Sequence, residues 1–319
     1  MAVTDGSAED EPGAEPVTPK WTRRRVLAVG LGGVAAAVAI GATGVELVAH
    51  GVLPGRQTLD QLDGGCDVAA VPLRYSSPGP SSSGTFYSEA RHTTVGYTLA
   101  YPPGHGPGSA LPLVVMLHGF GGNHRTALAG MSPAQAVALE VAGRPLTPMA
   151  LVTVDGGGGY WNPHPGDDPL AMVTDELIPR CQQLGLGSTP HAVATMGISM
   201  GGYGALLIAE RYPHLVAAVA AISPAIWTTY DQAQSANAGA FSSEEAFATN
   251  DAITLAHRLA GRPVRIASGD DDPFHPGVVA LAAALPTSAV VEVAPGCHTG
   301  PFFASREPAA LAFLGSHLQ

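Results

Sequence analysis

A serine stands between glycines in Gly197-Ile198-Ser199-Met200-Gly201. The stretch before it, His191 to Thr195, is short and mostly apolar, which predicts a buried strand. The stretch after it, Tyr203 to Glu210, predicts a helix. Between a strand and a helix, G-x-S-x-G predicts a sharp turn that exposes the serine hydroxyl beside a helix N-terminus, which favours developing negative charge. The alternative interpretation is a glycine-rich turn that carries a solvated serine.

A serine is a weak nucleophile unless a base activates it and a third group orients the base. In open α/β sheets the reactive groups gather at the carboxyl ends of the strands. Two apolar strands are predicted downstream of Ser199, at Val264 to Ala267 and at Val290 to Val293. An acid and a histidine are therefore expected in the loops that follow these strands.

The first of these loops contains three consecutive aspartates, of which we predict Asp272 as the orienting acid. It completes a Gly-x-x-Asp turn, and the proline after it fixes the loop; Asp271 is the alternative. The second loop contains His298 between two glycines, and we predict it as the base, with His275 as the weaker candidate. The order Ser, Asp, His is the order of the α/β-hydrolase arrangement. In isolation, each residue also fits a solvated loop.

An acyl-transfer site also needs donors for an oxyanion. The predicted strand Leu113 to Leu117 ends in His118-Gly119-Phe120-Gly121-Gly122, a loop whose backbone N–H groups can face the site. We predict the N–H groups of Phe120 and Met200 as the pair of donors. We expect His118 to hold this loop through hydrogen bonds rather than to take part in the chemistry. No HExxH motif or clustered ligand spacing occurs, so we expect neither a metal nor another cofactor.

Strands that alternate with helices predict an α/β fold with a mostly parallel sheet and helices on both faces. Further strands are predicted at Thr85 to Tyr87, Thr93 to Tyr101 and Met149 to Val154, whereas Val216 to Ile222 fits a strand or a helix. The predicted helices are Pro133 to Val141, Leu170 to Gln183, Glu244 to Leu259, Val278 to Leu285 and Pro308 to Leu318.

The chain has 319 residues, and its first part differs in composition from the rest. Residues 1–20 are polar and acidic, which predicts a disordered cytoplasmic leader. Residues 21–50 combine Arg23-Arg24-Arg25 with a long uncharged apolar run, which resembles a twin-arginine signal and is also long enough for a membrane anchor. Residues 51–83 read as a linker and surface strap, and residues 84–319 as the catalytic domain. We therefore expect export across the cytoplasmic membrane, in a secreted or an anchored form.

The chain has three cysteines, and an odd number leaves one thiol free or paired between chains. Export permits a disulfide, and we favour Cys66 with Cys297, because Cys181 lies in a helical pattern that predicts burial. The formal net charge of −11 and the absence of a basic patch with aromatic residues argue against a nucleic-acid partner. The oligomeric state stays open.

The assembled motifs show a resemblance to a known family. His118-Gly-Phe-Gly-Gly, Gly197-x-Ser199-x-Gly201-Gly-Tyr-Gly, Gly269-x-x-Asp272-Pro-Phe and Gly296-x-His298 resemble the "Putative esterase" group of the α/β-hydrolase superfamily. That group includes S-formylglutathione hydrolases, feruloyl and acetyl xylan esterases, and mycolyltransferases. The resemblance covers residues 84–319 and implies Ser199 as nucleophile, His298 as base and then acid, Asp272 as its orienter, and Phe120 and Met200 as oxyanion donors.

In these proteins a loop near the active site resembles Asp155 to Asn162, where Tyr160 and Trp161 either line a substrate pocket or pack under the loop. The expected function is hydrolysis of a small-molecule, lipid or carbohydrate ester through an acyl-enzyme. Two alternatives stay open. One is acyl transfer to a cell-envelope sugar or lipid alcohol, and the other is a non-catalytic envelope binding protein on a hydrolase fold.

Overall fold

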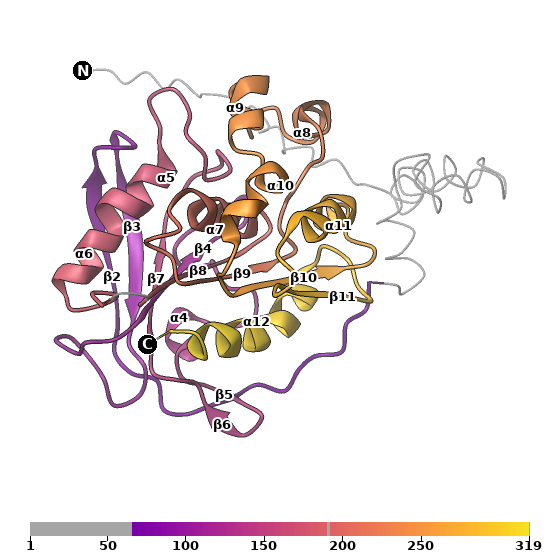
Figure 1. Ribbon diagram of the computed structural model, residues 1–319. Helices are drawn as coiled ribbons and strands as arrows, with labels where there is room; N and C mark the ends of the chain where they lie inside the picture. Colours follow the sequence, from indigo (N-terminus) through magenta and orange to yellow (C-terminus); the bar gives the residue numbers. More distant parts are fainter. Residues whose placement is uncertain (1–65, 190–191, 319) are drawn as a thin grey trace, which may run out of the picture. The chain divides into compact units, whose positions relative to one another are not determined.

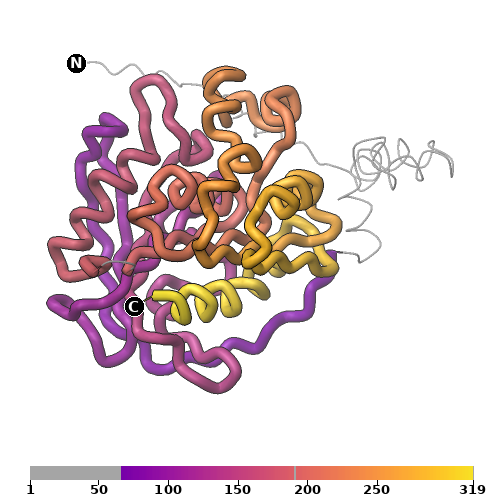
Figure 2. The backbone as a smooth tube through the Cα atoms, in the orientation of Figure 1, coloured from indigo at the N-terminus to yellow at the C-terminus, as the bar shows by residue number. Residues whose placement is uncertain are grey.

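The computed structural model describes residues 66–189 and 192–318, and an eight-stranded sheet lies at their centre (Figures 1 and 2). The strand order is β11-β10-β9-β8-β4-β7-β3-β2. Six neighbouring strands, from β11 to β7, run parallel, while β3 is antiparallel to β7 and β2 is antiparallel to β3. The strands are β2 (Ser81–Ser88), β3 (Thr93–Ala100), β4 (Leu113–Leu117), β7 (Ala150–Val154), β8 (Val193–Ile198), β9 (Ala218–Ile222), β10 (Val264–Gly269) and β11 (Val290–Ala294). The mostly parallel sheet confirms the prediction, and the ambiguous stretch at 216–222 contains a strand.

The sheet separates two hydrophobic cores, and β4 shows how the sequence supplies both of them. Every residue of β4 is buried. Leu113, Val115 and Leu117 belong to one core, whereas Val114 and Met116 belong to the other. Successive side chains of a strand point to opposite faces of the sheet, so a continuous apolar run is what a strand covered on both faces requires.

Helices cover both faces, as the alternating pattern predicts. The first core includes buried residues from α6 (Ile178–Gln183), α7 (Met200–Arg211), α10 (Ala252–Leu255) and α11 (His275–Ala284). The second core includes residues of α4 (Pro133–Ala136) and α12 (Gly300–Gly315), and α12 runs across the face of the sheet opposite α7 in Figure 1. In the predicted helix 170–183, α5 (Pro169–Ala171) and α6 flank a π-helical segment, Met172–Leu177.

The predicted helix 133–141 is only partly correct. It ends at Ala136, and residues 139–141 form the strand β5 (Leu139–Val141), which pairs with β1 (Arg74–Tyr75) and β6 (Arg144–Pro145). The turn between β5 and β6 consists of Ala142 and Gly143, both with positive φ, 51° and 74°. Two such residues form the tight turn that fits a β-hairpin, and this local signal overrides the helical pattern.

Two other helices also differ from the expectation. The last helix begins at Gly300 rather than at Pro308, so Pro308 lies inside α12. The predicted helix 244–259 is divided into α9 (Glu244–Thr249), α10 and a 3-10 turn (Ala256–Leu259), and the Asp251 side chain caps α10 by accepting the N–H of Ile253 at 3.0 Å. Helix α8 (Tyr230–Ala236) has no counterpart in the expectation.

The segment before the sheet belongs to the folded structure from residue 66 onward. β1 lies within the predicted linker and pairs with β5, and β2 begins at Ser81, three residues before the expected start of the domain. Cys66 and Cys297 form the expected disulfide, and Cys181 is a free, buried thiol. The predicted leader, the signal or anchor and residues 51–65 lie outside the described residues. Within the described part, no helix is both long and apolar enough to span a bilayer.

Candidate active site

Ser199 occupies the strand-to-helix turn that the sequence predicts. It follows β8 directly and precedes the first residue of α7, with φ 55° and ψ −120°. Hydrogen bonds fix this unfavourable backbone conformation: the Ser199 N–H donates to Ile222 O at 2.9 Å, and its carbonyl accepts from the Ala225 N–H at 3.0 Å. A non-glycine residue at positive φ is uncommon. Here the hydrogen bonds to the end of β9 and to the segment after it hold Ser199 in this conformation.

The two glycines of the motif are required because backbone atoms approach them closely. A Cβ at Gly197 would lie 2.0 Å from Gly201 O, and a Cβ at Gly201 would lie 2.0 Å from Leu117 O. Neither position can therefore carry a side chain without moving the turn or the neighbouring strand β4. The spacing of the glycines is thus a packing requirement of the turn that presents Ser199.

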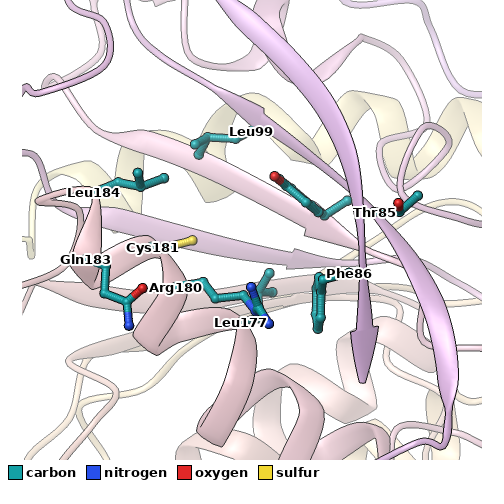
Figure 3. A pocket seen from close by; sticks show the side chains of 9 residues that line it. Thr85, Phe86, Leu99, Leu177, Arg180, Cys181, Gln183 and Leu184 are labelled. Atoms are coloured by element: carbon teal, nitrogen blue, oxygen red, sulfur yellow. The ribbon is translucent and has the colours of Figure 1, made fainter. Parts of the chain in front are cut away.

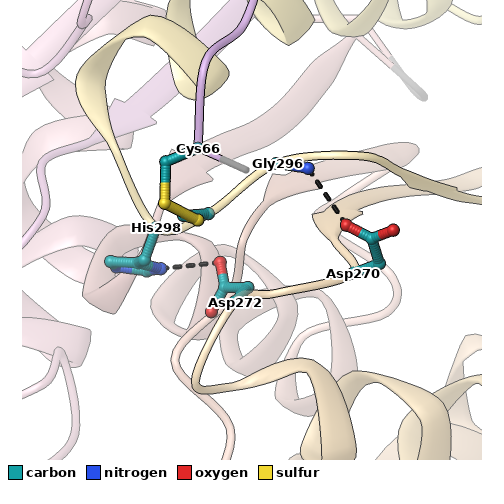
Figure 4. Close-up of a disulfide and its surroundings, with 6 residues drawn as sticks. Cys66, Asp270, Asp272, Gly296 and His298 are labelled. Atoms are coloured by element: carbon teal, nitrogen blue, oxygen red, sulfur yellow. Dashed lines mark hydrogen bonds and ion pairs between the residues drawn. A yellow bond between two sulfur atoms is a disulfide. The ribbon is translucent and has the colours of Figure 1, made fainter. Parts of the chain in front are cut away.

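The structure brings Ser199, His298 and Asp272 together from the ends of three different strands. Ser199 follows β8, Asp272 follows β10, and His298 follows β11. The Nε2 atom of His298 lies 2.8 Å from Ser199 Oγ, and its Nδ1 atom lies 2.8 Å from Asp272 Oδ2 (Figure 4 shows the second contact). A carboxylate only accepts hydrogen bonds, so Nδ1 carries the hydrogen and Nε2 is free to accept the serine hydroxyl.

Asp272 is well placed to orient the imidazole. Its side chain has no solvent exposure, and its second oxygen, Oδ1, accepts the Phe274 N–H at 2.8 Å. Of the two aspartates that the sequence left open, Asp272 is the one bonded to His298. The other histidine candidate, His275, begins α11, and its N–H donates to the Asp272 carbonyl at 2.9 Å.

The predicted oxyanion donors come from the first residue of α7 and from the loop after β4. Met200 is the first residue of α7, so its N–H is one of the helix N-terminal donors that have no partner within the helix. In the loop after β4, the Gly122 N–H donates to Gly119 O at 3.0 Å, and the Phe120 N–H has no partner among the described residues. A Cβ at Gly119 would lie 3.6 Å from the Ser199 Cβ, so the loop adjoins the nucleophile.

His118 holds this loop, as the sequence predicts. Its ring is fully buried; Nδ1 donates to Gly119 O at 2.8 Å, and Nε2 accepts the Gly156 N–H at 2.9 Å. These partners require the neutral ring, because a carbonyl only accepts and an amide N–H only donates. Burial lowers the pKa of His118 below its ordinary value of 6.5, which favours the same neutral form.

A cavity of about 340 Å³ opens beside Ser199. Its lining residues are Gly119, Phe120, Gly122, Thr126, Ala127, Ala129, Ile198, Ser199, His298 and Phe303. Apart from His298, none of these side chains is ionisable, so the cavity suits an uncharged group. The sequence did not point to Phe303, which lies in the first turns of α12 with its ring centre 4.9 Å from that of His298. Phe274 contacts the same imidazole at 5.1 Å, and only its place in the Asp-Pro-Phe motif singles it out.

Tyr160 and Trp161 are buried and do not line this cavity. Trp161 has no exposed surface; its indole Nε1 donates to His118 O at 3.2 Å, and a Cβ at Gly156 would lie 2.2 Å from its ring. Tyr160 packs against Trp227, with ring centres 4.8 Å apart, and burial raises its pKa to about 12. For Trp161 the structure thus favours the packing alternative, because the side chain supports the loop that carries His118.

A second cavity, of about 230 Å³, lies away from Ser199, between the edge strand β2, its neighbour β3 and helix α6 (Figure 3). The Arg180 guanidinium lies over the Phe86 ring at 4.6 Å, and Cys181 contributes its thiol to the wall. Burial raises the pKa of this thiol to about 12, so it remains protonated. Among residues 66–189 and 192–318, no cluster of three potential metal ligands occurs.

Comparisons with known proteins agree with this fold. A structure described as a ferulic acid esterase matches with a TM-score of 0.63 at 18% identity, covering 75% of this chain and 98% of that one. An S-formylglutathione hydrolase from Agrobacterium tumefaciens matches with a TM-score of 0.61 at 17% identity, covering 79% and 100%. MPT51 (FbpC1) from Mycobacterium tuberculosis matches with a TM-score of 0.57 at 15% identity, covering 78% and 100%. No match is found among curated proteins.

The sheet, its flanking helices and the turn at Ser199 define an α/β-hydrolase fold. The model of the family described as "Putative esterase" matches residues 88–284, more than half of the chain, and the chain belongs to that family. The matched range includes Ser199 and Asp272, whereas His298 lies beyond it.

Proposed function

We propose that this protein is a serine hydrolase that cleaves carboxylic esters. The observation that carries the proposal is the hydrogen-bonded series from Ser199 Oγ through the His298 imidazole to Asp272, with 2.8 Å at each contact. In a family of esterases, this arrangement matches the requirements for an activated serine: a nucleophile, a base within reach, and a buried carboxylate that fixes the base.

Each step of the proposed reaction has a candidate group among the residues described above. Ser199 Oγ attacks the ester carbonyl while His298 Nε2 takes its proton, and the Phe120 and Met200 N–H groups stabilise the oxyanion. The imidazolium then gives its proton to the leaving alcohol, and an acyl-enzyme remains. Water then attacks the acyl-enzyme and loses a proton to His298. The imidazolium gives this proton to the leaving Ser199 Oγ, and the carboxylic acid is released.

The cavity indicates a small, uncharged substrate group. Its volume of about 340 Å³ and its walls of glycine, alanine, isoleucine and phenylalanine suit a short acyl or aryl group. The names of the structural relatives, ferulic acid esterase and S-formylglutathione hydrolase, also denote enzymes of small substrates. We propose carboxylic esters of this size, without a metal or other cofactor.

The decisive experiment compares the wild-type enzyme with Ser199→Ala. We expect the variant to fold normally by circular dichroism and to lose hydrolysis of p-nitrophenyl acetate and butyrate, as well as labelling by a fluorophosphonate. Retained hydrolysis would remove Ser199 as nucleophile. A wild-type enzyme that neither hydrolyses the ester panel nor reacts with the fluorophosphonate would support a binding protein instead.

The same acyl-enzyme can also react with an alcohol other than water. Adding glycerol or trehalose to the assay and measuring the ratio of acid to transferred ester tests the acyltransferase alternative. For the proposed hydrolase we expect the free acid to remain the main product. A dominant transfer product would make the protein an acyltransferase at the same catalytic site.

We further propose that the protein acts outside the cytoplasmic membrane. The support is the sequence of residues 21–50, where the arginines precede the apolar run. Replacing both Arg23 and Arg24 by lysine should retain the protein in the cytoplasm, if the twin-arginine pathway carries it. The mass of the exported wild-type chain then distinguishes a cleaved signal from an uncleaved anchor, and unchanged export of the variant would contradict this route.

A further inference from the structure

A disulfide joins the first described residue of the chain to the residue immediately before His298. Cys66 is bonded to Cys297 across a sequence separation of 231 residues (Figure 4). Cys297 has no exposed surface, whereas Cys66 is partly exposed. The proposed catalytic base therefore lies next to a covalent link to residues 66–80. These residues are the described part of the predicted linker and surface strap that precedes β2, and only they are called the strap below.

In the loop that carries His298, residues 295–299, only Gly296 joins the acid loop through backbone hydrogen bonds among the described residues. The Gly296 N–H donates to Asp270 Oδ1 at 3.0 Å, and the Gly296 carbonyl accepts the Asp271 N–H at 3.1 Å. In the described part of the chain, the backbone of residues 297–299 makes no hydrogen bond to any segment other than this loop and α12. The Thr299 N–H, for example, donates to Cys297 O at 2.9 Å.

The strap supplies the attachment that the backbone of this loop lacks. Besides the disulfide, the Val68 side chain reaches the loop, since a Cβ at Gly296 would lie 3.3 Å from Val68 Cγ2. Residues 296 and 297 are thus held by hydrogen bonds from the acid loop and by the disulfide and Val68 of the strap. His298 must contact Asp272 and Ser199 simultaneously at 2.8 Å, so a small displacement of this loop breaks one of the two contacts.

We propose that the Cys66–Cys297 disulfide is a positioning element for His298, and that its reduction by a dithiol switches ester hydrolysis off. This inference rests on the proposed function. The thiolate of the reductant attacks Sγ of Cys66, the partly exposed residue of the pair, and Cys297 leaves as a thiolate and takes a proton. The second thiol of the reductant then displaces Cys66, so that one cyclic disulfide and two protein thiols are formed. Two electrons pass from the reductant to the protein.

No other described cysteine competes for this exchange. Cys181 is buried in α6, and its thiol remains protonated, so it is a poor nucleophile towards the disulfide. The redox state of one bond thus determines whether the strap holds the loop. An exported enzyme would then have low activity in a reducing cytoplasm and full activity where disulfides form.

The test compares kcat and KM for p-nitrophenyl acetate in the oxidised and the reduced full-length enzyme. Dithiothreitol is removed before the assay under anaerobic conditions, and thiol titration verifies complete reduction. We expect kcat to fall by about ten- to a hundredfold, because a displacement on the order of 1 Å at a reacting group has that effect. KM should change less than about twofold, since the cavity walls come mainly from other segments, and reoxidation should restore kcat.

Two variants separate positioning from a general loss of structure. Cys66→Ser should have the low kcat of the reduced enzyme and should no longer respond to the reductant. Cys181→Ala is the matched control and should respond to the reductant as the wild-type enzyme does. All forms are measured at a temperature at which near-ultraviolet circular dichroism shows them to be folded.

The outcomes distinguish this inference from the function on which it rests. Equal kcat in the oxidised and the fully reduced enzyme would overturn the positioning role and leave the ester hydrolase intact. Loss of activity only in parallel with loss of the near-ultraviolet signal would also overturn it, because the disulfide would then serve stability alone. An oxidised enzyme without any hydrolysis would overturn the proposed function, and the switch with it.

Discussion

Two hydrogen bonds to Asp272 determine the state of the proposed catalytic base. One carboxylate oxygen accepts from the Phe274 N–H and the other from His298 Nδ1, so both acceptors are in use. The buried carboxylate thus fixes the imidazole as the tautomer whose Nε2 can take a proton from Ser199. Its charge also stabilises the imidazolium that forms during the reaction.

Asp272→Asn tests this arrangement at the level of one atom. An amide has a single acceptor oxygen, so the variant either leaves the Phe274 N–H unpaired or turns its NH₂ group towards His298. In the second case, His298 Nδ1 must accept from the amide NH₂, so the ring hydrogen moves to Nε2. Nε2 can then no longer accept the hydroxyl hydrogen of Ser199. We expect a fall in kcat of roughly 10³- to 10⁴-fold in a folded protein. Asp271→Asn is the matched control, and a comparable fall in its kcat would contradict the assignment of Asp272 as the orienting acid.

Glu307 is a buried carboxyl that the sequence did not single out. It lies on α12 and accepts the Ala129 and Gly130 N–H groups at 2.5 and 3.1 Å, and Ala129 lines the cavity beside Ser199. Burial raises the pKa of Glu307 from 4.5 to about 7, although the two N–H groups favour the charged form. This carboxyl therefore links the cavity wall to the helix that follows His298, and its protonation depends on pH near neutrality.

The sign of this shift predicts how stability depends on pH. Because the pKa of Glu307 is higher in the folded state, its stabilising contribution is full below pH 4.5 and is lost as the pH rises to about 7. Glu307→Gln should remove this dependence, which amounts to at most about 3 kcal/mol at ~1.4 kcal/mol per pH unit. Urea denaturation of both proteins from pH 4.5 to 8 measures the difference. If the free energy of unfolding changed with pH in the same way in both proteins, Glu307 would not titrate in this range.

At the scale of the elements, the sequence predicts the sheet and the reactive loops well, because these depend on local patterns. Apolar runs identify strands that are buried on both faces. The reactive loops are then the segments that come directly after the predicted strands, as they do after β8, β10 and β11. The helices are predicted less well. Pro308 reads as a helix start, although it lies within α12, and the turn at Ala142 and Gly143 reverses the chain inside an apparent helix.

The surroundings of the site were the least predictable part, for a physical reason. Phe303 lines the cavity and Glu307 bonds its wall because of the way α12 packs against the sheet, which no local pattern encodes. The expected disulfide, in contrast, needed only the count of cysteines and the burial of Cys181. Residues with a motif of their own were thus predicted, whereas residues placed by tertiary packing were not.

Gly201→Ala tests the turn at the start of α7. The new Cβ would lie 2.0 Å from Leu117 O and 2.7 Å from His118 O, so either the turn or the end of β4 must move. We expect a loss of stability of about 3 kcal/mol or more, together with loss of activity. Gly106→Ala is the control, because its Cβ would meet only Pro80 Cγ, at 3.6 Å. Normal stability of Gly201→Ala, measured by thermal unfolding, would contradict this account of the turn.

The disulfide between Cys66 and Cys297 closes a loop that contains most of the described chain. For a sequence separation of 231, the loop-entropy model gives a stabilisation of about 5 kcal/mol relative to the reduced chain. Reduction should therefore lower the midpoint of thermal unfolding by roughly 10 °C, while the protein stays folded at room temperature. Differential scanning calorimetry with and without reductant tests this expectation. An unchanged midpoint would mean that the reduced, unfolded chain is already constrained in another way.

The strand order places the proposed nucleophile after a central strand and the proposed base after an edge strand. Ser199 follows β8, which has neighbours on both sides, whereas His298 follows β11, which is an edge strand bonded only to β10. Edge strands open more readily than central ones, because hydrogen bonds hold them on one side only. On gentle heating, the enzyme should thus lose its base while the nucleophile is still presented by an intact core. Inactivation would then precede melting, and cooling would restore turnover without refolding of the whole chain.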